Sequence, residues 1–219
     1  MKRKIKIILS WILIVAIPIA TLGLSANIIL RLPDLYQYQI NKGELLKEYR
    51  ASSQSEEVAA LISEYMIHKV DELQYQTDEE DEMSLIFTKK DQEKAEAVRF
   101  FADVLGAITI LSIVIITITY YLLIKEGHLA AIRSRFKLAS VIFVALGILT
   151  LLCCHIPNLK EKIFESVFYG VEELDFVYKL LCCGTYSAFC VTTVMFSIVI
   201  MLLFTYFTWK KTKERGIFW

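Results

Sequence analysis

Few side chains in this chain of 219 residues could transfer a proton near neutral pH, and the clearest of them are three histidines. His155 lies two residues before Pro157, at the end of an apolar stretch, and is the best placed of the three to act as a base. The same position also suits a side chain that anchors a helix end at a membrane boundary. We expect His68 on the polar side of a helix and His128 in a solvated loop. His155 is therefore the candidate base among the histidines.

Two pairs of adjacent cysteines border apolar stretches, Cys153 with Cys154 and Cys182 with Cys183. A disulfide between the pairs and a packed arrangement of free thiols both remain open. Adjacent cysteines lack the two-residue spacing that is usual for zinc ligands, so we expect no metal site. The sequence contains no nucleophile elbow, phosphate-binding glycine loop, zinc-protease helix or dinucleotide fingerprint. We therefore expect no cofactor.

Hydropathy predicts the elements that must position these residues. The chain is 56% hydrophobic with a mean hydropathy of +0.50, which is too high for a soluble globular protein. Four uncharged stretches reach the length of about 20 residues that a helix needs to cross a bilayer. We therefore predict an all-α, polytopic membrane protein with four transmembrane helices and a helical extracytoplasmic cap. The predicted order is a basic N-terminus with the first span (1–30), an extracytoplasmic helical loop (31–103), the second span (104–124), a basic cytoplasmic loop (125–137), the third span (138–154), an extracytoplasmic amphipathic loop (155–179), the fourth span (180–208) and a basic cytoplasmic tail (209–219).

The formal net charge of zero is the sum of two opposite parts. Residues 1–6, 125–137 and 209–219 together hold twelve Lys or Arg and two acids, a net charge of +10, and the remaining segments carry −10. Because basic loops stay in the cytoplasm, we expect a multi-pass protein of the cell membrane with both termini cytoplasmic. The span cores contain no Asp, Glu, Lys, Arg or His, which argues against pumps, secondary transporters and cation channels.

The first outer loop contains one amphipathic pattern and two capping signals. Apolar residues recur at steps of three and four between residues 53 and 75, and Ser53 with Glu56 forms a possible capping box. Thr88 with Asp91 forms the second signal.

A single helix is expected to follow that second signal and to lead into the second span, because no Gly or Pro occurs from Lys89 to Gly106. It would hold Lys94, Arg99 and Asp103 just above the outer leaflet. The second outer loop is predicted to form an interfacial helix over residues 158–170.

Two short motifs carry a resemblance to a known family. They are Phe87-Thr88-Lys89-Lys90-Asp91, which leads through Val98-Arg99 into the second span, and Ile163-Phe164-Glu165-Ser166-Val167-Phe168 after the third span. With the order of spans and loops, they resemble the lipoprotein intramolecular transacylase (Lit-type) family of Gram-positive bacteria over nearly the whole chain. The resemblance implies an acyltransferase that moves an acyl chain onto the N-terminal amine of a lipoprotein at the outer leaflet. Membrane lipids, and lipoproteins or another membrane protein, would be its partners, and nucleic acid would not.

The family's pair of histidines is not retained at the matching positions, which are Lys94 and Glu165. Lys94 and Glu165 could form an altered acid/base pair, with His155 as a further candidate catalytic residue. They could equally form a salt bridge or be solvated. Two hypotheses follow: a lipid acyltransferase with altered or lost catalysis, and a non-catalytic binding or assembly subunit that uses its amphipathic surfaces.

Overall fold

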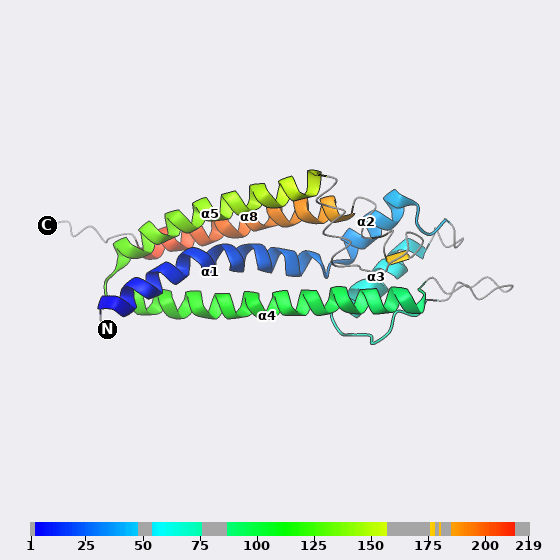
Figure 1. Cartoon of the computed structure of the whole chain (residues 1–219), viewed down its shortest axis with the longest axis horizontal. Helices are drawn as coiled ribbons and strands as arrows, with labels where there is room; N and C mark the ends of the chain where they lie inside the picture. The colour runs from blue at the N-terminus through cyan, green and yellow to red at the C-terminus, as the bar shows by residue number, and fades with distance from the viewer. Residues whose placement is uncertain are drawn as a thin grey trace. The chain divides into compact units, whose positions relative to one another are not determined.

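The computed structural model describes residues 3–47, 54–75, 87–156, 176–177, 180 and 185–212. Within these residues the regular secondary structure is helical throughout (Figure 1). The helices are α1 (Arg3–Ile29), α2 (Pro33–Gly43), α3 (Ser55–Met66), α4 (Lys89–Lys125), α5 (Leu129–His155) and α8 (Thr185–Thr212). Four of them, α1, α4, α5 and α8, are long and apolar enough to cross a membrane. The predicted all-α architecture with four spans is thereby confirmed. The interfacial helix expected over 158–170 lies outside the described residues.

The chain divides into two compact units. The membrane unit comprises Met1–Ser25, Leu105–Thr150 and Thr193–Trp219, and the cap unit comprises Ala26–Val104 and Leu151–Thr192. α4 is one helix of 37 residues, about 55 Å long at 1.5 Å per residue, and it contributes residues to both units. This continuity confirms the single helix predicted from Lys89.

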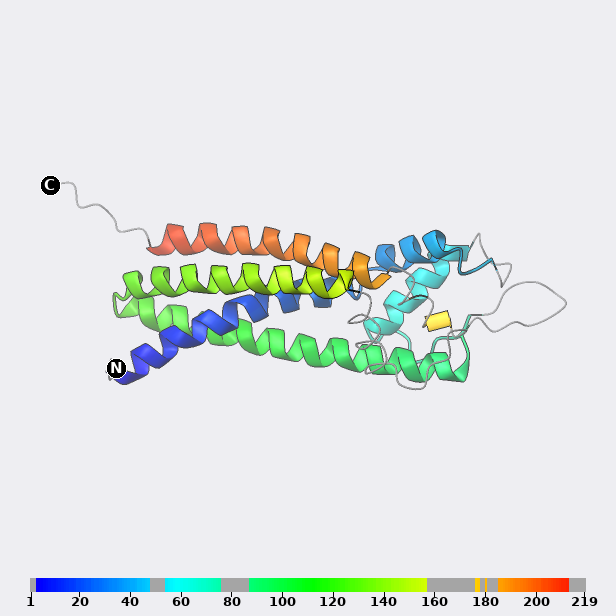
Figure 2. The same cartoon turned by 45° about the horizontal axis from the view of Figure 1, so that its top comes forward.

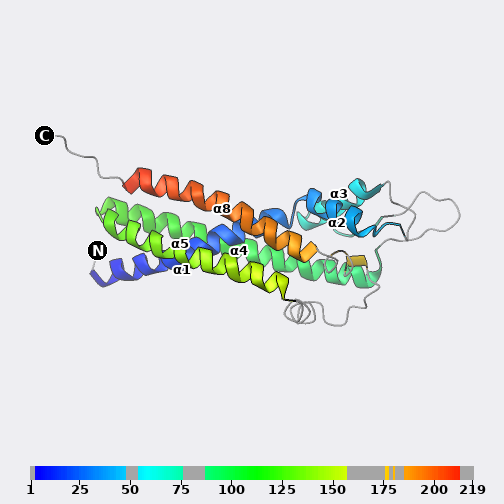
Figure 3. The same cartoon turned by 90° about the horizontal axis from the view of Figure 1, so that it is seen from above.

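Helices α1, α5 and α8 run alongside the C-terminal part of α4 in the membrane unit (Figures 2 and 3). Their shared core includes the apolar side chains of Leu13, Ile17, Leu123, Ile132 and Phe136. Other large apolar side chains of the same helices are mostly exposed, among them Ile110, Val141, Met195 and Leu202. Exposed apolar surface on this scale is suited to contact with lipid.

Several hydroxyl groups within these helices donate to the backbone of their own helix. Thr109 Oγ1 donates to Leu105 O at 2.8 Å and Ser112 Oγ donates to Ile108 O at 2.8 Å. Thr21 Oγ1 donates to Ile17 O at 2.9 Å, next to Pro18, which lies inside α1. Such bonds remove the cost of placing a polar group in a medium without water.

Cations at one end of the membrane unit stack on aromatic rings. The Arg135 guanidinium lies 4.2 Å from the centroid of the Trp11 ring. Arg133 donates from Nε to Thr212 Oγ1 at 3.1 Å and also bonds Thr212 O, at the last residue of α8. The two bonds from Arg133 hold the last turn of α8 against the start of α5. Such donors are needed there because the carbonyl groups at the end of a helix lack intrahelical donors.

The cap unit is built around the packing of α2 on α3. Its core includes Tyr36 and Ile40 from α2 and Val58, Ile62 and Tyr65 from α3. The apolar face predicted for the segment 53–75 is therefore buried inside the cap unit.

The helix predicted over 53–75 is shorter than expected, because α3 ends at Met66. His68 has a φ of 60°, in the left-handed region, and its N–H bonds Tyr65 O at 3.1 Å while Lys69 N–H bonds Glu64 O at 2.9 Å. The chain turns there, and Leu73 returns to the core of the cap unit. Gln54 is the N-cap of α3, and its side chain makes no hydrogen bond that caps the helix. Ser53 of the predicted capping box lies outside the described residues.

The capping box predicted at the start of α4 is confirmed. Asp91 N–H donates to Thr88 Oγ1 at 3.2 Å, and Thr88 N–H donates to Asp91 Oδ2 at 3.0 Å. Asp91 is fully buried, and its Oδ1 also accepts the N–H of Val177 at 2.9 Å. One carboxylate therefore caps α4 and holds a distant segment against it.

Gly23 of α1 packs tightly against Thr109 of α4 in the membrane unit. A methyl group on its Cα would lie 2.3 Å from Thr109 Oγ1, inside van der Waals contact. Since Thr109 is held by its bond to Leu105 O, the space is available only to glycine.

We predict that Gly23→Ala destabilises the membrane unit by about 1–3 kcal/mol, the usual cost of overpacking a core. Thermal unfolding in detergent micelles measures this as a lower Tm. Gly147→Ala is the matched control, because its added methyl group would lie 3.7 Å from Val194 Cγ1, an ordinary contact. This control should leave the Tm unchanged or raise it, since alanine favours a helix. Equal behaviour of the two variants would contradict the prediction.

Candidate functional site

Two polar side chains of the cap unit, those of Arg31 and His68, contact the carboxylate of Asp103. Arg31, just beyond the end of α1, donates from Nη2 to Asp103 Oδ1 at 2.8 Å. His68, in the turn after α3, has its Nε2 2.8 Å from Asp103 Oδ2. Three segments distant in sequence therefore meet at one carboxylate. We call Arg31, His68 and Asp103 the Asp103 cluster.

The backbone around the Asp103 cluster is held by two further side chains. Asn27 Nδ2 donates to Ala102 O at 2.6 Å, which fastens the end of α1 to α4 one residue before Asp103. Ser63 Oγ donates to Arg31 O at 2.5 Å, which fastens α3 to the residue after α1. Both contacts restrict the positions from which Arg31 and Asp103 reach each other.

The chemistry available to the Asp103 cluster is proton transfer. A carboxylate on one imidazole nitrogen fixes the orientation of the ring, and the other nitrogen is then free to exchange a proton with a substrate. In His68 the nitrogen left for a substrate is Nδ1, and the side chain is 52% exposed, so a substrate could approach it. Arg31 holds the far oxygen of the carboxylate and prevents it from turning away.

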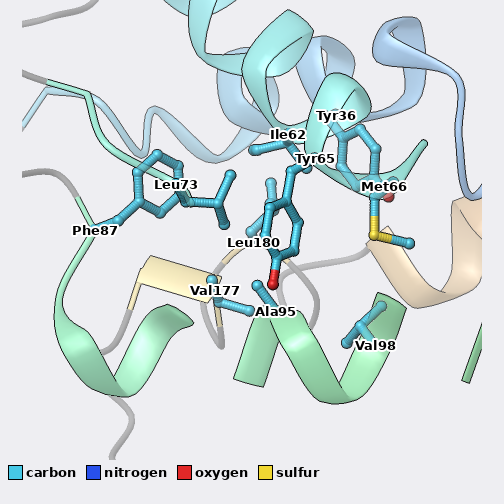
Figure 4. Close-up of a pocket in the computed structure, with 10 residues that line it drawn as sticks. All are labelled: Tyr36, Ile62, Tyr65, Met66, Leu73, Phe87, Ala95, Val98, Val177 and Leu180. Carbon is cyan, nitrogen blue, oxygen red and sulfur yellow. The ribbon is translucent and has the colours of Figure 1, made fainter. Parts of the chain in front are cut away.

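Next to the cluster, α3 and α4 enclose a small apolar cavity of about 30 Å³ (Figure 4). The Tyr65 side chain extends from α3 toward Ala95 on α4, and Phe87, Leu73 and Val177 close one side. The rings of Phe87 and Phe176 meet edge to face with centroids 5.2 Å apart. The walls carry almost no polar group, so only an apolar group would enter.

The residues singled out from the sequence lie apart from the Asp103 cluster or outside the described side chains. Lys94 lies on α4, half-buried, and does not line the cavity. His155 is the last residue of α5, and Glu165 lies outside the described residues. The Cys153 thiol is free. Among the residues that the structure describes, no three His, Cys, Asp or Glu side chains are grouped closely enough to hold a metal ion.

The sequence did contain a signal for the Asp103 cluster. Arg31 directly follows the first apolar stretch and Asp103 directly precedes the second, so two opposite charges border the same face of the membrane. Opposite charges at neighbouring helix ends at one depth are suited to pairing. His68 was expected at the surface, and its bond to Asp103 depends on the left-handed turn after α3, which no residue pattern announces.

Comparisons with known proteins locate the fold. No protein-family model matches the sequence, and no curated protein matches it. Among solved structures, an in meso structure of the membrane-integral lipoprotein intramolecular transacylase Lit from Bacillus cereus matches with a TM-score of 0.68 and 11% identity, covering 97% of this chain and 99% of that one. A structure of the same enzyme with a histidine-to-arginine substitution matches with a TM-score of 0.70 and 12% identity, covering 97% and 94%. The chain therefore has the Lit fold, in a strongly diverged sequence.

Tyr36 is expected to lower the free energy of unfolding of the cap unit as the pH rises into the alkaline range. Its hydroxyl is buried and donates to Leu30 O at 2.5 Å. Burial raises the pKa of Tyr36 well above its ordinary value of 10.0, and nearby Arg31 only partly opposes this. The unfolded chain therefore releases this proton first as the pH rises.

We predict that the contribution of Tyr36 to the free energy of unfolding is constant below about pH 10. Above that pH it falls by up to about 1.4 kcal/mol per pH unit. Tyr36→Phe should lower the Tm at pH 8, because the hydrogen bond is lost, and should weaken the fall between pH 10 and 11. Tyr38→Phe, on the exposed side of the same helix, should change neither. An unaltered alkaline fall in Tyr36→Phe would refute the prediction.

Proposed function

We propose that this chain is an acyltransferase of the outer leaflet that acts on membrane lipoproteins. The Lit fold supports this, because the enzyme with that fold is a lipoprotein intramolecular transacylase. The observation that carries the proposal is the bond between His68 and Asp103, since it supplies an oriented base on a cap unit rich in acids. At 11% identity the fold does not transfer an activity, so the proposal depends on these residues.

The proposed reaction moves an acyl chain from an ester of the lipoprotein's diacylglyceryl group to the amine of its N-terminal cysteine. His68 takes a proton from the amine, and the amine nitrogen forms a bond to the ester carbonyl carbon. The bond from that carbon to the alcohol oxygen breaks, and His68 returns the proton to this oxygen. An amide and an alcohol result, and no oxidant, reductant or water is consumed. Lys94, Glu165 and His155 are the further candidates proposed from the sequence.

The proposed orientation places the cap unit outside the cell and both termini in the cytoplasm. The support is the charge distribution, +10 on the segments 1–6, 125–137 and 209–219 against −10 on the rest. In this orientation Asp103 lies at the outer end of the second span, where the ester of a membrane-anchored lipoprotein is found.

The alternative is a non-catalytic binding or assembly subunit, favoured by Lys94 and Glu165 at the positions where the family has histidines. That hypothesis assigned partner binding to the apolar face of the segment 53–75. Val58, Ile62 and Tyr65 of this face are instead buried in the core of the cap unit. These three side chains are therefore not available to a partner, while the other amphipathic surfaces, such as the one predicted over 158–170, stay with that hypothesis.

The proposal predicts that the chain converts diacyl lipoproteins to N-acylated lyso-forms in a bacterial strain that lacks its own transacylase. Mass spectrometry of the N-terminal lipopeptides measures the conversion. Removing an oriented base usually costs about 10²–10⁴-fold in rate, so His68→Gln should abolish conversion, and Asp103→Asn should strongly reduce it.

His128→Gln is the matched control, because it makes the same change at a residue between α4 and α5, outside the cap unit. It should convert normally. Lys94→Gln and His155→Gln are measured in the same assay. If one of them loses conversion while His68→Gln keeps full activity, that residue and not His68 is the base. Diacyl forms that stay unchanged in cells making the wild-type chain would reject the enzyme proposal.

A further inference from the structure

Arg135 of α5 carries a guanidinium group that is stacked on an aromatic ring but paired with no described acid. Its guanidinium carbon lies 4.2 Å from the centroid of the Trp11 ring of α1, so the indole covers one face of the group. No hydrogen bond or ion pair joins Arg135 to another residue that the structure describes, and the residue is only half-buried. The N–H groups along the edge of the guanidinium can therefore bind an anion that is not part of the described chain.

Basic side chains predominate at the end of the membrane unit where Arg135 lies. α4 ends there, α5 begins there, and the last residue of α8 is bound there by Arg133 (Figure 1). One described acid lies in this region, Glu126, and it is 3.8 Å from His128. The described Lys and Arg residues of the same region are Lys125, Arg133, Arg135, Lys137, Lys210 and Lys211. The electrostatic potential at this end is therefore positive, which favours a ligand with a net negative charge.

The surface of α1 beside Arg135 is apolar and exposed. Ile8, Trp11, Ile12 and Val15 follow one another at the spacing that places residues on one face of a helix, and they are 59%, 51%, 36% and 57% exposed. Leu138, one turn after Arg135 on α5, is 39% exposed. An anion that binds Arg135 therefore meets apolar side chains as well, and a lipid is a ligand that carries both groups.

The charges of α5 are confined to one end of a membrane span. α5 holds Lys and Arg only within its first nine residues, and residues 138–155 contain no Asp, Glu, Lys or Arg. Because the hydrocarbon core does not accommodate unpaired charges, this end of the span meets the polar headgroups of the lipids. Tryptophan and tyrosine are typical of that boundary. Four such rings in the membrane unit each lie under a cation, namely Trp11, Tyr121, Tyr206 and Trp209.

We propose that Arg135 and Trp11 form a binding site for the headgroup of an anionic phospholipid, whose chains lie along the exposed apolar face of α1. The planar guanidinium offers paired N–H donors that match phosphate oxygens, and the indole holds it in place. The neighbouring cations favour a lipid with a net negative charge over a zwitterionic one. The site lies within the membrane unit, and it does not depend on the acyl transfer proposed above.

Quenching of Trp11 fluorescence by lipids with brominated chains tests the site in the full chain, reconstituted into bilayers. Trp209 and Trp219 are replaced by Phe, which leaves Trp11 as the only tryptophan. Titration with brominated phosphatidylglycerol and with brominated phosphatidylcholine gives the ratio of the two binding constants at Trp11. We expect phosphatidylglycerol to be favoured by about fivefold, the effect of one cation at an anionic membrane surface. Arg135→Gln should bring the ratio close to one, and Arg135→Lys, which keeps the charge without the paired donors, should give an intermediate ratio.

Lys210→Gln is the matched control, because it removes one cation that lies over an aromatic ring, Tyr206, at the same end of the membrane unit. It should keep the wild-type ratio. An equal loss in Lys210→Gln would assign the preference to the general charge of this end and would overturn the proposal, as would a wild-type ratio near one. Failure of both lipids to quench Trp11 would show that protein, such as a second copy of the chain, covers this face, which also overturns it.

Inorganic phosphate separates a lipid from a free anion as the ligand. Its addition at millimolar concentration should leave the ratio unchanged, and a fall of the ratio to one would assign the site to the free anion and reject the lipid. If Arg135→Gln does not fold, as circular dichroism would show, the wild-type ratio in Arg135→Lys decides against the paired donors and against the site.

Discussion

The carboxylate of Asp103 makes the polar contacts that fix three segments of the cap unit around its apolar core. It is bound at one oxygen by Arg31 and at the other by His68, so it joins the end of α1, the turn after α3 and α4. Because the side chains of Asp103 and His68 are 37% and 52% exposed, water screens these charges, and the contacts supply mainly geometry. The contact that orients the His68 ring therefore also holds the turn after α3 against α4.

The two units meet different physical demands. In the membrane unit several hydroxyls bond the backbone of their own helix, the hydroxyls of Tyr120 and Thr208 pair between α4 and α8 at 3.1 Å, and Gly23 of α1 leaves room for Thr109 of α4. In the cap unit polar groups pair between distant segments, as in the contact of Asp91 with Val177. Such long-range pairs fix the segments of the cap unit against one another.

Sequence patterns predicted the spans, the start of α4 and its continuity, because hydropathy and the Thr88–Asp91 capping box act over short distances in the chain. They did not predict the end of α3, since a left-handed His68 is not the glycine that usually marks such a turn. The Asp103 cluster was likewise missed, because it depends on contacts between segments more than 30 residues apart. The family resemblance gave the fold but directed attention to Lys94, which lies away from the cluster.

The continuity of α4 has a consequence for selectivity. Asp103 and the first residue of the second apolar stretch are neighbours on one helix, with no Gly or Pro between Lys89 and Gly106 to let them move separately. The height of the carboxylate over the bilayer is therefore set by the hydrocarbon boundary itself. A carboxylate at this boundary is closer to molecules anchored in the leaflet than to molecules dissolved in the surrounding water. The second span and Asp103 therefore move as one rigid piece of helix.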